Sequence, residues 1–119
     1  MDNNFFLTAV FPFILRKRES LLKQMGEIET MSRGNLSEEY RERHVNGKTV
    51  QRGPYYKYQV WEDGRNKSRR VKADEAQQLR QGIEGLDKFK KLSSEYIDAT
   101  IELTEQERGD EADSKKNSR

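Results

Sequence analysis

Cysteine is absent from the sequence, and histidine occurs once, at His44. The lack of thiols excludes disulfides, thiolate metal sites and a cysteine nucleophile, and a single imidazole gives no basis for a zinc site. The sequence also lacks the Gly-x-Ser-x-Gly signature of a serine nucleophile and the glycine-rich loop that cradles phosphates. We therefore expect a protein that is not an enzyme and that carries no catalytic residue, no metal and no cofactor.

Apolar residues are also scarce. Of the 119 residues, 32% are hydrophobic and 9% are aromatic, which limits the chain to one modest core. The apolar stretch Phe5–Leu15 is too short to span a bilayer, and Asp2 precedes it where a secretory signal would carry positive charge. We expect a cytoplasmic protein without a membrane partner.

Charge is distributed unevenly along the chain. Residues 40–72 hold ten Lys or Arg against three Asp or Glu, a net charge of +7. Residues 1–39 hold five against six, and residues 73–119 hold eight against twelve, so the flanking segments carry net charges of −1 and −4. The middle third is a concentrated cation, and it attracts a polyanion within a Debye length of about 8 Å at physiological salt.

Apolar residues recur at spacings of three and four between Pro12 and Arg33. That period predicts an amphipathic helix with Pro12 in its first turn, where the missing N–H would be unpaired in any case. Gly34 is placed to end this helix. We expect residues 1–33 to form the N-terminal helix of one compact domain.

Two turn dipeptides mark the middle of the chain as β structure. Asn46-Gly47 suits a type I′ turn because both residues accept positive φ, and Asp63-Gly64 provides a second turn. The expected strands span residues 40–45, 49–51, 55–61 and 65–72. These two hairpins predict an antiparallel sheet of three or four strands, and with the flanking helices they make the chain an α+β protein.

Alternation along strand 55–61 separates two faces of the sheet. The face with Tyr56, Tyr58 and Val60 is typical of a core, whereas the face with Tyr55 and Trp61, and with Lys57 and Gln59, is typical of an exposed surface. Trp61 at the edge of the core is the alternative.

A seam of apolar residues at spacings of three and four predicts a long final helix from Asp74, the expected cap, to about Glu107. Gly82 and Gly85 within it indicate a kink or a close approach to the sheet. The helix and the sheet form residues 34–107 of the same compact domain. Residues 108–119 have no apolar period, and we expect a disordered tail there.

Several short segments occur in a distinctive order: Gly34-Asn35-Leu36, Asn46-Gly47-Lys48, Gly53-Pro54-Tyr55-Tyr56, Asp63-Gly64-Arg65 and Ile83–Phe89. Over residues 32–105 this order resembles a family of small uncharacterised bacterial and archaeal proteins encoded beside transposases and other mobile elements. Members of that family often carry a cysteine-rich insert where this chain has residues 44–52 without cysteine, so no metal role is carried over. The hairpin and helix are also loosely similar to the three-stranded DNA-binding arm of tyrosine integrases. The resemblance implies an accessory protein of a mobile element.

The basic middle segment predicts nucleic-acid binding, because guanidinium and ammonium groups neutralise phosphates and release counterions. A two-stranded ribbon fits the major groove of DNA, and Tyr55 and Trp61 offer stacking surfaces for the unpaired bases of DNA or RNA. We expect the second hairpin to carry the main contacts. The candidate contact residues are Arg41, Arg43, Lys48, Arg52, Tyr55, Lys57, Trp61, Arg65, Lys67, Arg69 and Arg70.

Two other interpretations remain open at this point. The basic hairpins can be a solvated surface that matches the acidic final helix. Alternatively, the apolar N-terminus and the long helical seam indicate an adaptor or inhibitor that binds a nucleoprotein enzyme, such as a transposase or an RNA-guided nuclease, or that pairs two copies of the chain in a homodimer.

Overall fold

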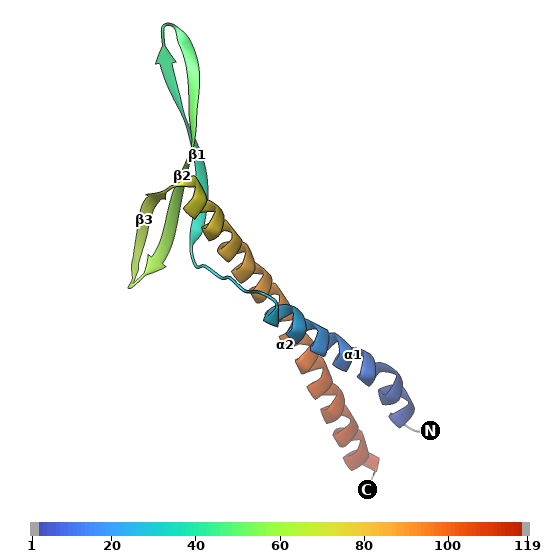
Figure 1. Ribbon diagram of the computed structural model, residues 1–119. Coiled ribbons are helices and arrows are strands. Elements are labelled where there is room, and N and C mark those ends of the chain that lie inside the picture. The colour runs from blue at the N-terminus through green and yellow to red at the C-terminus, as the bar shows by residue number, and fades with distance from the viewer. Residues whose placement is uncertain (1–2, 118–119) are drawn as a thin grey trace. The chain divides into compact units, whose positions relative to one another are not determined.

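The computed structural model describes the backbone of residues 3–117 and the side chains of residues 12–109. The elements follow one another as helix α1 (Asn3–Gly26), strands β1 (Asn35–Val45), β2 (Lys48–Glu62) and β3 (Arg65–Val71), and helix α2 (Ala73–Asn117). This order confirms the α+β class expected from the sequence (Figure 1).

The chain divides into two compact units, a division that the sequence pattern does not predict. The segment through Ile28 and the chain from Lys88 onward form one unit, and Glu29–Asp87 form the other. Helix α2 belongs to both units, since it begins in the second and continues through the first. None of the helices in the described part of the chain is long and apolar enough to cross a bilayer.

The helical unit packs α1 against the second half of α2 through two small apolar clusters. Ile14 lies with Ala99 and Leu103 in one cluster, and Leu21 and Met25 lie with Leu92 in the other. Between them, Arg18 donates a hydrogen bond of 3.0 Å to the Thr100 hydroxyl, and its guanidinium lies over the Tyr96 ring. The stripe of apolar residues in α1 therefore meets the seam of α2, as their spacings predict.

The ends of both helices differ from the expected positions. Helix α1 begins before Pro12, which lies inside it, and ends at Gly26 rather than near Gly34. Gly34 has a φ of +105° at the start of β1, where an added Cβ would lie 2.5 Å from the Gln59 carbonyl oxygen, so it serves the sheet and not the helix. Helix α2 begins one residue before Asp74, the expected cap, and continues to Asn117, through a segment for which the sequence pattern predicts no order.

The sheet has three strands in the order β1-β2-β3, all antiparallel. Both turns have two residues with positive φ: 53° and 74° at Asn46 and Gly47, and 53° and 73° at Asp63 and Gly64. These are the dihedral signs of a type I′ turn, which confirms the two hairpins expected from the dipeptides. The hairpins share β2, which continues through Gly53-Pro54 without interruption.

The first turns of α2 cover one face of this sheet. Val71 and Ala76 are buried there, and Arg80 of α2 lies with its guanidinium 5.9 Å from the centre of the Tyr56 ring. Gly82 lets α2 pass close to the segment that connects α1 and β1, because an added Cβ would collide with Ser32. The face with Tyr56 is therefore the covered face, and the other face of the sheet is free of α2.

Candidate nucleic-acid interface

A β-bulge between the two halves of β2 decides which side chains share a face. Glu39 of β1 pairs with Tyr55, but Arg41, two residues further, pairs with Arg52, three residues back along β2. Strand β2 therefore has one residue more than β1 at this point, which is the definition of a bulge. Gly53, with a φ of +137°, lies within it. A residue added to one strand reverses the alternation of its side chains beyond that position.

This reversal places the cations of the first hairpin on the open face of the sheet. Without the bulge, Lys48 and Arg52 would lie on the face opposite Tyr55, since their distances along β2 are odd. With the bulge they pair with Val45 and Arg41, and the side chains of paired residues lie on the same side of the sheet. We call the resulting surface the basic face. It comprises Arg41, Arg43, Lys48, Arg52, Tyr55, Lys57, Trp61 and Arg70.

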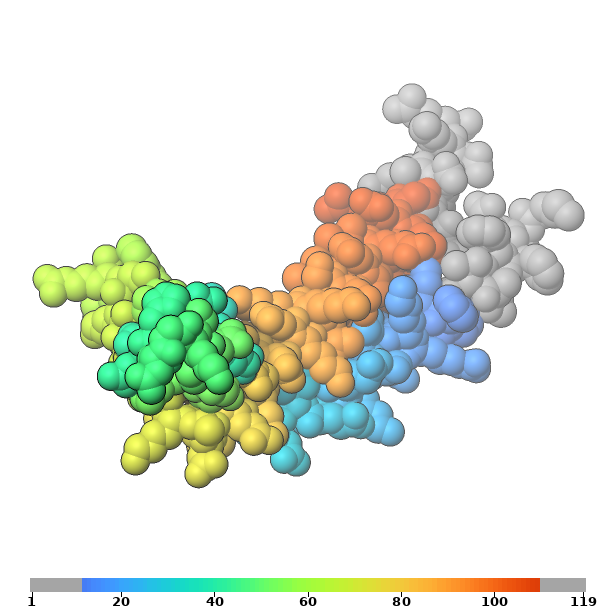
Figure 2. Space-filling view, turned by 90° about the horizontal axis from the view of Figure 1, so that it is seen from above, coloured from blue at the N-terminus to red at the C-terminus, as the bar shows by residue number. Residues whose placement is uncertain are grey.

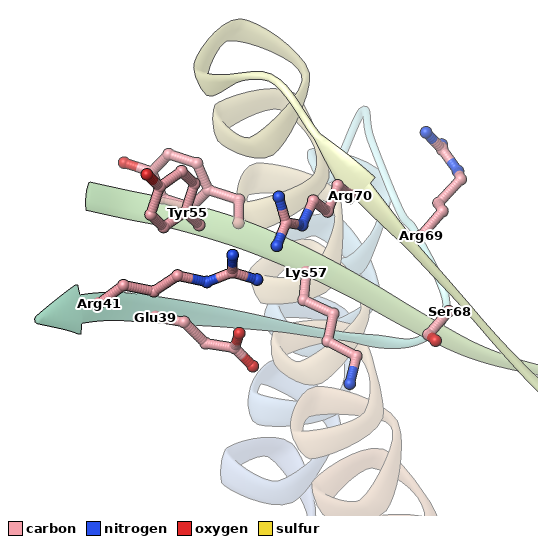
Figure 3. A pocket seen from close by; sticks show the side chains of 8 residues that line it. Glu39, Arg41, Tyr55, Lys57, Ser68, Arg69 and Arg70 are labelled. Carbon is pink, nitrogen blue, oxygen red and sulfur yellow. The ribbon is translucent and has the colours of Figure 1, made fainter. Parts of the chain in front are cut away.

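The contacts between side chains support this assignment. The guanidiniums of Arg41 and Arg70 lie 5.2 Å and 5.4 Å from the centre of the Tyr55 ring, which places β1, β2 and β3 residues on one side. Figure 3 shows both guanidiniums turned toward Tyr55, whereas Arg69 points away from it. Within the part of the chain that the structure describes, the cations of the basic face make no ion pair with Asp or Glu.

The remaining candidate cations, Arg65, Lys67 and Arg69, lie on the covered face because they pair with Glu62, Val60 and Tyr58. Lys67 lies 3.6 Å from a Glu62 carboxylate oxygen and 3.9 Å from Asp63. Arg69 forms an ion pair with Glu75 in the first turn of α2.

The pair between Arg69 and Glu75 affects the titration of both groups. Its hydrogen bond raises the pKa of the Arg69 guanidinium and lowers the pKa of the Glu75 carboxyl. This ion pair joins β3 to the start of α2, so the charge of Arg69 is already neutralised within the protein. Of the four candidate cations on β3, the far strand of the second hairpin that was expected to carry the main contacts, Arg70 alone thus lies on the basic face.

A hollow of about 290 Å³ lies on the basic face, among side chains from all three strands. Arg41, Tyr55, Lys57 and Arg70 line it, together with Glu39, which the sequence pattern did not single out (Figure 3). Arg69 also borders the hollow, but its charge is paired with Glu75. The other three cations and the one carboxylate leave a net positive charge in this hollow. It is therefore suited to an anion.

Strands β1 and β2 continue beyond β3 as a two-stranded arm, residues 40–53 (Figure 1). Every residue of the arm is exposed, and Figure 2 shows this segment, in green, at the molecular surface. Its basic side carries Arg41, Arg43, Lys48 and Arg52, and its other side carries Tyr40, Glu42, His44, Thr49 and Gln51. The arm is thus cationic on one side and neutral or acidic on the other.

His44 and Tyr40 lie on the other side of the arm, and each contacts a nearby side chain. His44 contacts the Thr49 hydroxyl at 3.3 Å across the arm, and Tyr40 donates a hydrogen bond of 3.2 Å to Glu38, which raises the pKa of the Tyr40 hydroxyl.

Trp61 is 70% exposed at the far end of the basic face. In the described part of the chain, no three His, Asp or Glu side chains come together as metal ligands would.

Comparison with known families gives one match. Residues 13–81 match a domain of unknown function, DUF6788, and this segment includes all three strands, the bulge and the first turns of α2. Comparisons with curated proteins and with solved structures give no significant match. Because the matched segment makes up more than half of the sequence, the chain belongs to the DUF6788 family.

Proposed function

We propose that this protein is a non-catalytic nucleic-acid-binding protein, and that the basic face contacts the phosphate backbone. The observation that carries the proposal is the one-sided gathering of Arg41, Arg43, Lys48, Arg52, Lys57 and Arg70. Three strands supply these side chains, and the bulge brings the arm's cations to the side of the others. A solvated surface needs no such alignment.

The charges of the basic face are available to a ligand. Ion pairs hold Lys67 and Arg69 on the covered face, whereas the described residues place no carboxylate within salt-bridge distance of Arg43, Arg52 or Arg70. Cations that are not neutralised by the protein's own acids gain most from releasing the counterions of a polyanion. Among the described residues, the carboxylate that α2 contributes, Glu75, therefore neutralises a cation of the covered face and none of the basic face.

The biological setting of the proposal comes from the sequence resemblance. The family that the Gly-Pro-Tyr-Tyr hairpin and long helix resemble is one encoded beside mobile elements, and this resemblance supports a role as an accessory protein of a mobile element or of a nucleoprotein complex in the cytoplasm. The ligand is DNA or RNA, since phosphate contacts do not distinguish the two.

The proposal predicts binding that weakens steeply with salt. Fluorescence anisotropy with labelled duplex and single-stranded oligonucleotides, across a salt series, should give a linear decrease of log K with log salt concentration. If four to six cations contact phosphates, the slope should be about −4 to −5 for duplex DNA. Binding that is absent at low salt, or that does not change with salt, would contradict the proposal.

A second candidate function rests on the helical unit. Phe13 is 71% exposed, and Leu22 and Ile97 are about half exposed, although all three are apolar. Exposed apolar area on a two-helix unit supports an adaptor that binds a nucleoprotein enzyme, or a homodimer formed through the helices. Phe5, Phe6 and Phe11 of the apolar N-terminus, on which the sequence also bases this role, lie outside the residues with described side chains. Partners that remain bound after nuclease treatment would favour the adaptor, and a doubled mass by light scattering would favour the homodimer.

A further inference from the structure

We propose that Arg41, Tyr55 and Arg70 form a clamp for one backbone phosphate, in which Tyr55 positions the two guanidiniums and does not stack on a base. This inference rests on the proposed function and specifies the ligand group of the hollow. The sequence pattern predicts the opposite role for Tyr55, as a stacking surface for unpaired bases. The difference follows from what lies over its ring.

The Tyr55 ring is already occupied by the protein's own side chains. The guanidiniums of Arg41 and Arg70 lie 5.2 Å and 5.4 Å from the centre of the ring, within the range of cation–π attraction. Tyr55 is half-buried, whereas Trp61 on the same face is 70% exposed. A base that stacked on Tyr55 would have to compete with these arginines for the ring, whereas the Trp61 ring is largely exposed.

The three strands fix the spacing of the two guanidiniums. Arg41 comes from β1 and Arg70 from β3, and Tyr55 lies between them on the central strand β2. An arginine side chain in water samples many rotamers and loses rotamer entropy when it is fixed. Stacking on Tyr55 restricts both side chains before the ligand arrives, so less entropy is lost on binding.

The hollow around Tyr55 suits a phosphodiester in charge. Arg41, Lys57 and Arg70 bring three positive charges, and Glu39 brings one negative charge, which leaves a surplus of two, while the charge of Arg69 is paired with Glu75. Guanidiniums donate paired N–H groups in a planar fork that matches two phosphate oxygens. One phosphodiester carries a single negative charge and two unesterified oxygens. It therefore offers acceptors to both arginines and neutralises part of the surplus charge.

The clamp makes distinct predictions for conservative and disruptive changes at Tyr55. Tyr55→Phe keeps the ring and should bind a labelled DNA duplex within about 2-fold of the wild type. Tyr55→Leu removes the ring and should bind roughly 5- to 10-fold more weakly, although it removes no charge. In the Arg41→Ala/Arg70→Ala background, Tyr55→Leu should change the affinity by less than about 2-fold, because residues that act as one unit are not additive.

A second variant keeps the clamp testable if Tyr55→Leu unfolds the sheet. Arg41→Lys/Arg70→Lys preserves both charges but loses the planar forks, and it should weaken binding several-fold while the salt slope stays unchanged. Thermal unfolding of each variant identifies loss of fold, and anisotropy on duplex and single-stranded DNA measures affinity.

The clamp is overturned if the loss of affinity from Tyr55→Leu is additive with that of the arginine changes and is larger on single-stranded DNA, which is the result expected of base stacking. It is also overturned if the lysine variant binds like the wild type. Absence of salt-dependent binding by the wild type contradicts the proposed function itself, and so the two failures are distinguishable.

Discussion

Replacing Arg43, Arg52 and Arg70 with alanine is expected to weaken binding to duplex DNA on the order of 100-fold at physiological salt. Each phosphate contact contributes about 1 kcal/mol near this salt concentration through counterion release, so three contacts contribute about 3 kcal/mol. The slope of log K against log salt should decrease by about 2 to 3 units. All three side chains are exposed, and the change in unfolding free energy should stay within about 0.5 kcal/mol for each.

The matched control removes the same number of charges from the covered face. Arg65, Lys67 and Arg69 are also exposed in their side chains, but they lie on the other side of the sheet, and two of them pair with acids. Their replacement by alanine should weaken binding by less than about 5-fold, because only the long-range field of the protein changes. Equal losses in the two triple variants would mean that net charge alone drives binding. The basic face would then have no special role.

Replacing Gly53 with alanine is expected to cost about 1–3 kcal/mol of stability in the sheet and to weaken binding on the order of 10-fold. Gly53 has a φ of +137°, and an added Cβ would lie 2.9 Å from the Glu39 carbonyl oxygen and 3.1 Å from the Tyr40 ring. The strand therefore has to move at the bulge. Movement there re-aims Lys48 and Arg52 relative to Lys57, which is why binding should suffer beyond the loss of stability.

Gly47→Ala separates the effect of the bulge from that of a positive φ. Gly47 has a φ of +74° in the turn of the same arm, but an added Cβ would meet no atom within 4 Å. Gly47→Ala should lower the free energy of unfolding by about 1 kcal/mol through backbone strain alone, and the affinity for DNA should change by less than about 2-fold. Thermal unfolding and anisotropy on both variants check the prediction. Equal binding by Gly53→Ala and the wild type, with the fold intact, would show that the bulge does not organise the interface.

The hairpins could be predicted from sequence because their signals are local. Asn46-Gly47 and Asp63-Gly64 accept the positive φ that a type I′ turn needs, and β-branched and aromatic residues fill the strand between them. Alternation then favours Tyr56 for the core side of the sheet and Trp61 for the exposed side, with the edge of the core as the alternative for Trp61; the structure places Tyr56 on the covered face and leaves Trp61 70% exposed. The order helix, sheet and long helix follows from periods of two and of three to four.

The face of Lys48 and Arg52 could not be predicted, because it depends on pairing between strands. Alternation counted along β2 assigns these two cations to the wrong side unless the extra residue at the bulge is known. The expected strands 49–51 and 55–61 leave a gap at Gly53-Pro54, where the structure instead has a bulge within the single strand β2. The ion pair of Arg69 with Glu75 joins a strand to a helix, and no sequence spacing indicates it.

The ends of the helices were missed for a similar reason. Gly26 lies within the apolar stripe that runs from Pro12 to Arg33, and Gly34 follows it, so spacing alone does not show which of the two glycines ends α1. The structure gives Gly34 to the sheet, where the carbonyl of Gln59 leaves no room for a Cβ. Contacts between residues that are distant in the sequence decide where such a helix ends.

The most direct test of the basic face is the protection of its lysines from acetylation when DNA is bound. Lys48 and Lys57 lie on the basic face, and Lys67 lies on the covered face. Mass spectrometry of the protein acetylated with and without a saturating DNA duplex measures the three positions in one experiment. We expect DNA to slow the modification of Lys48 and Lys57 several-fold and to leave Lys67 unchanged. Equal protection of all three lysines, or protection of Lys67 alone, would contradict binding through this face.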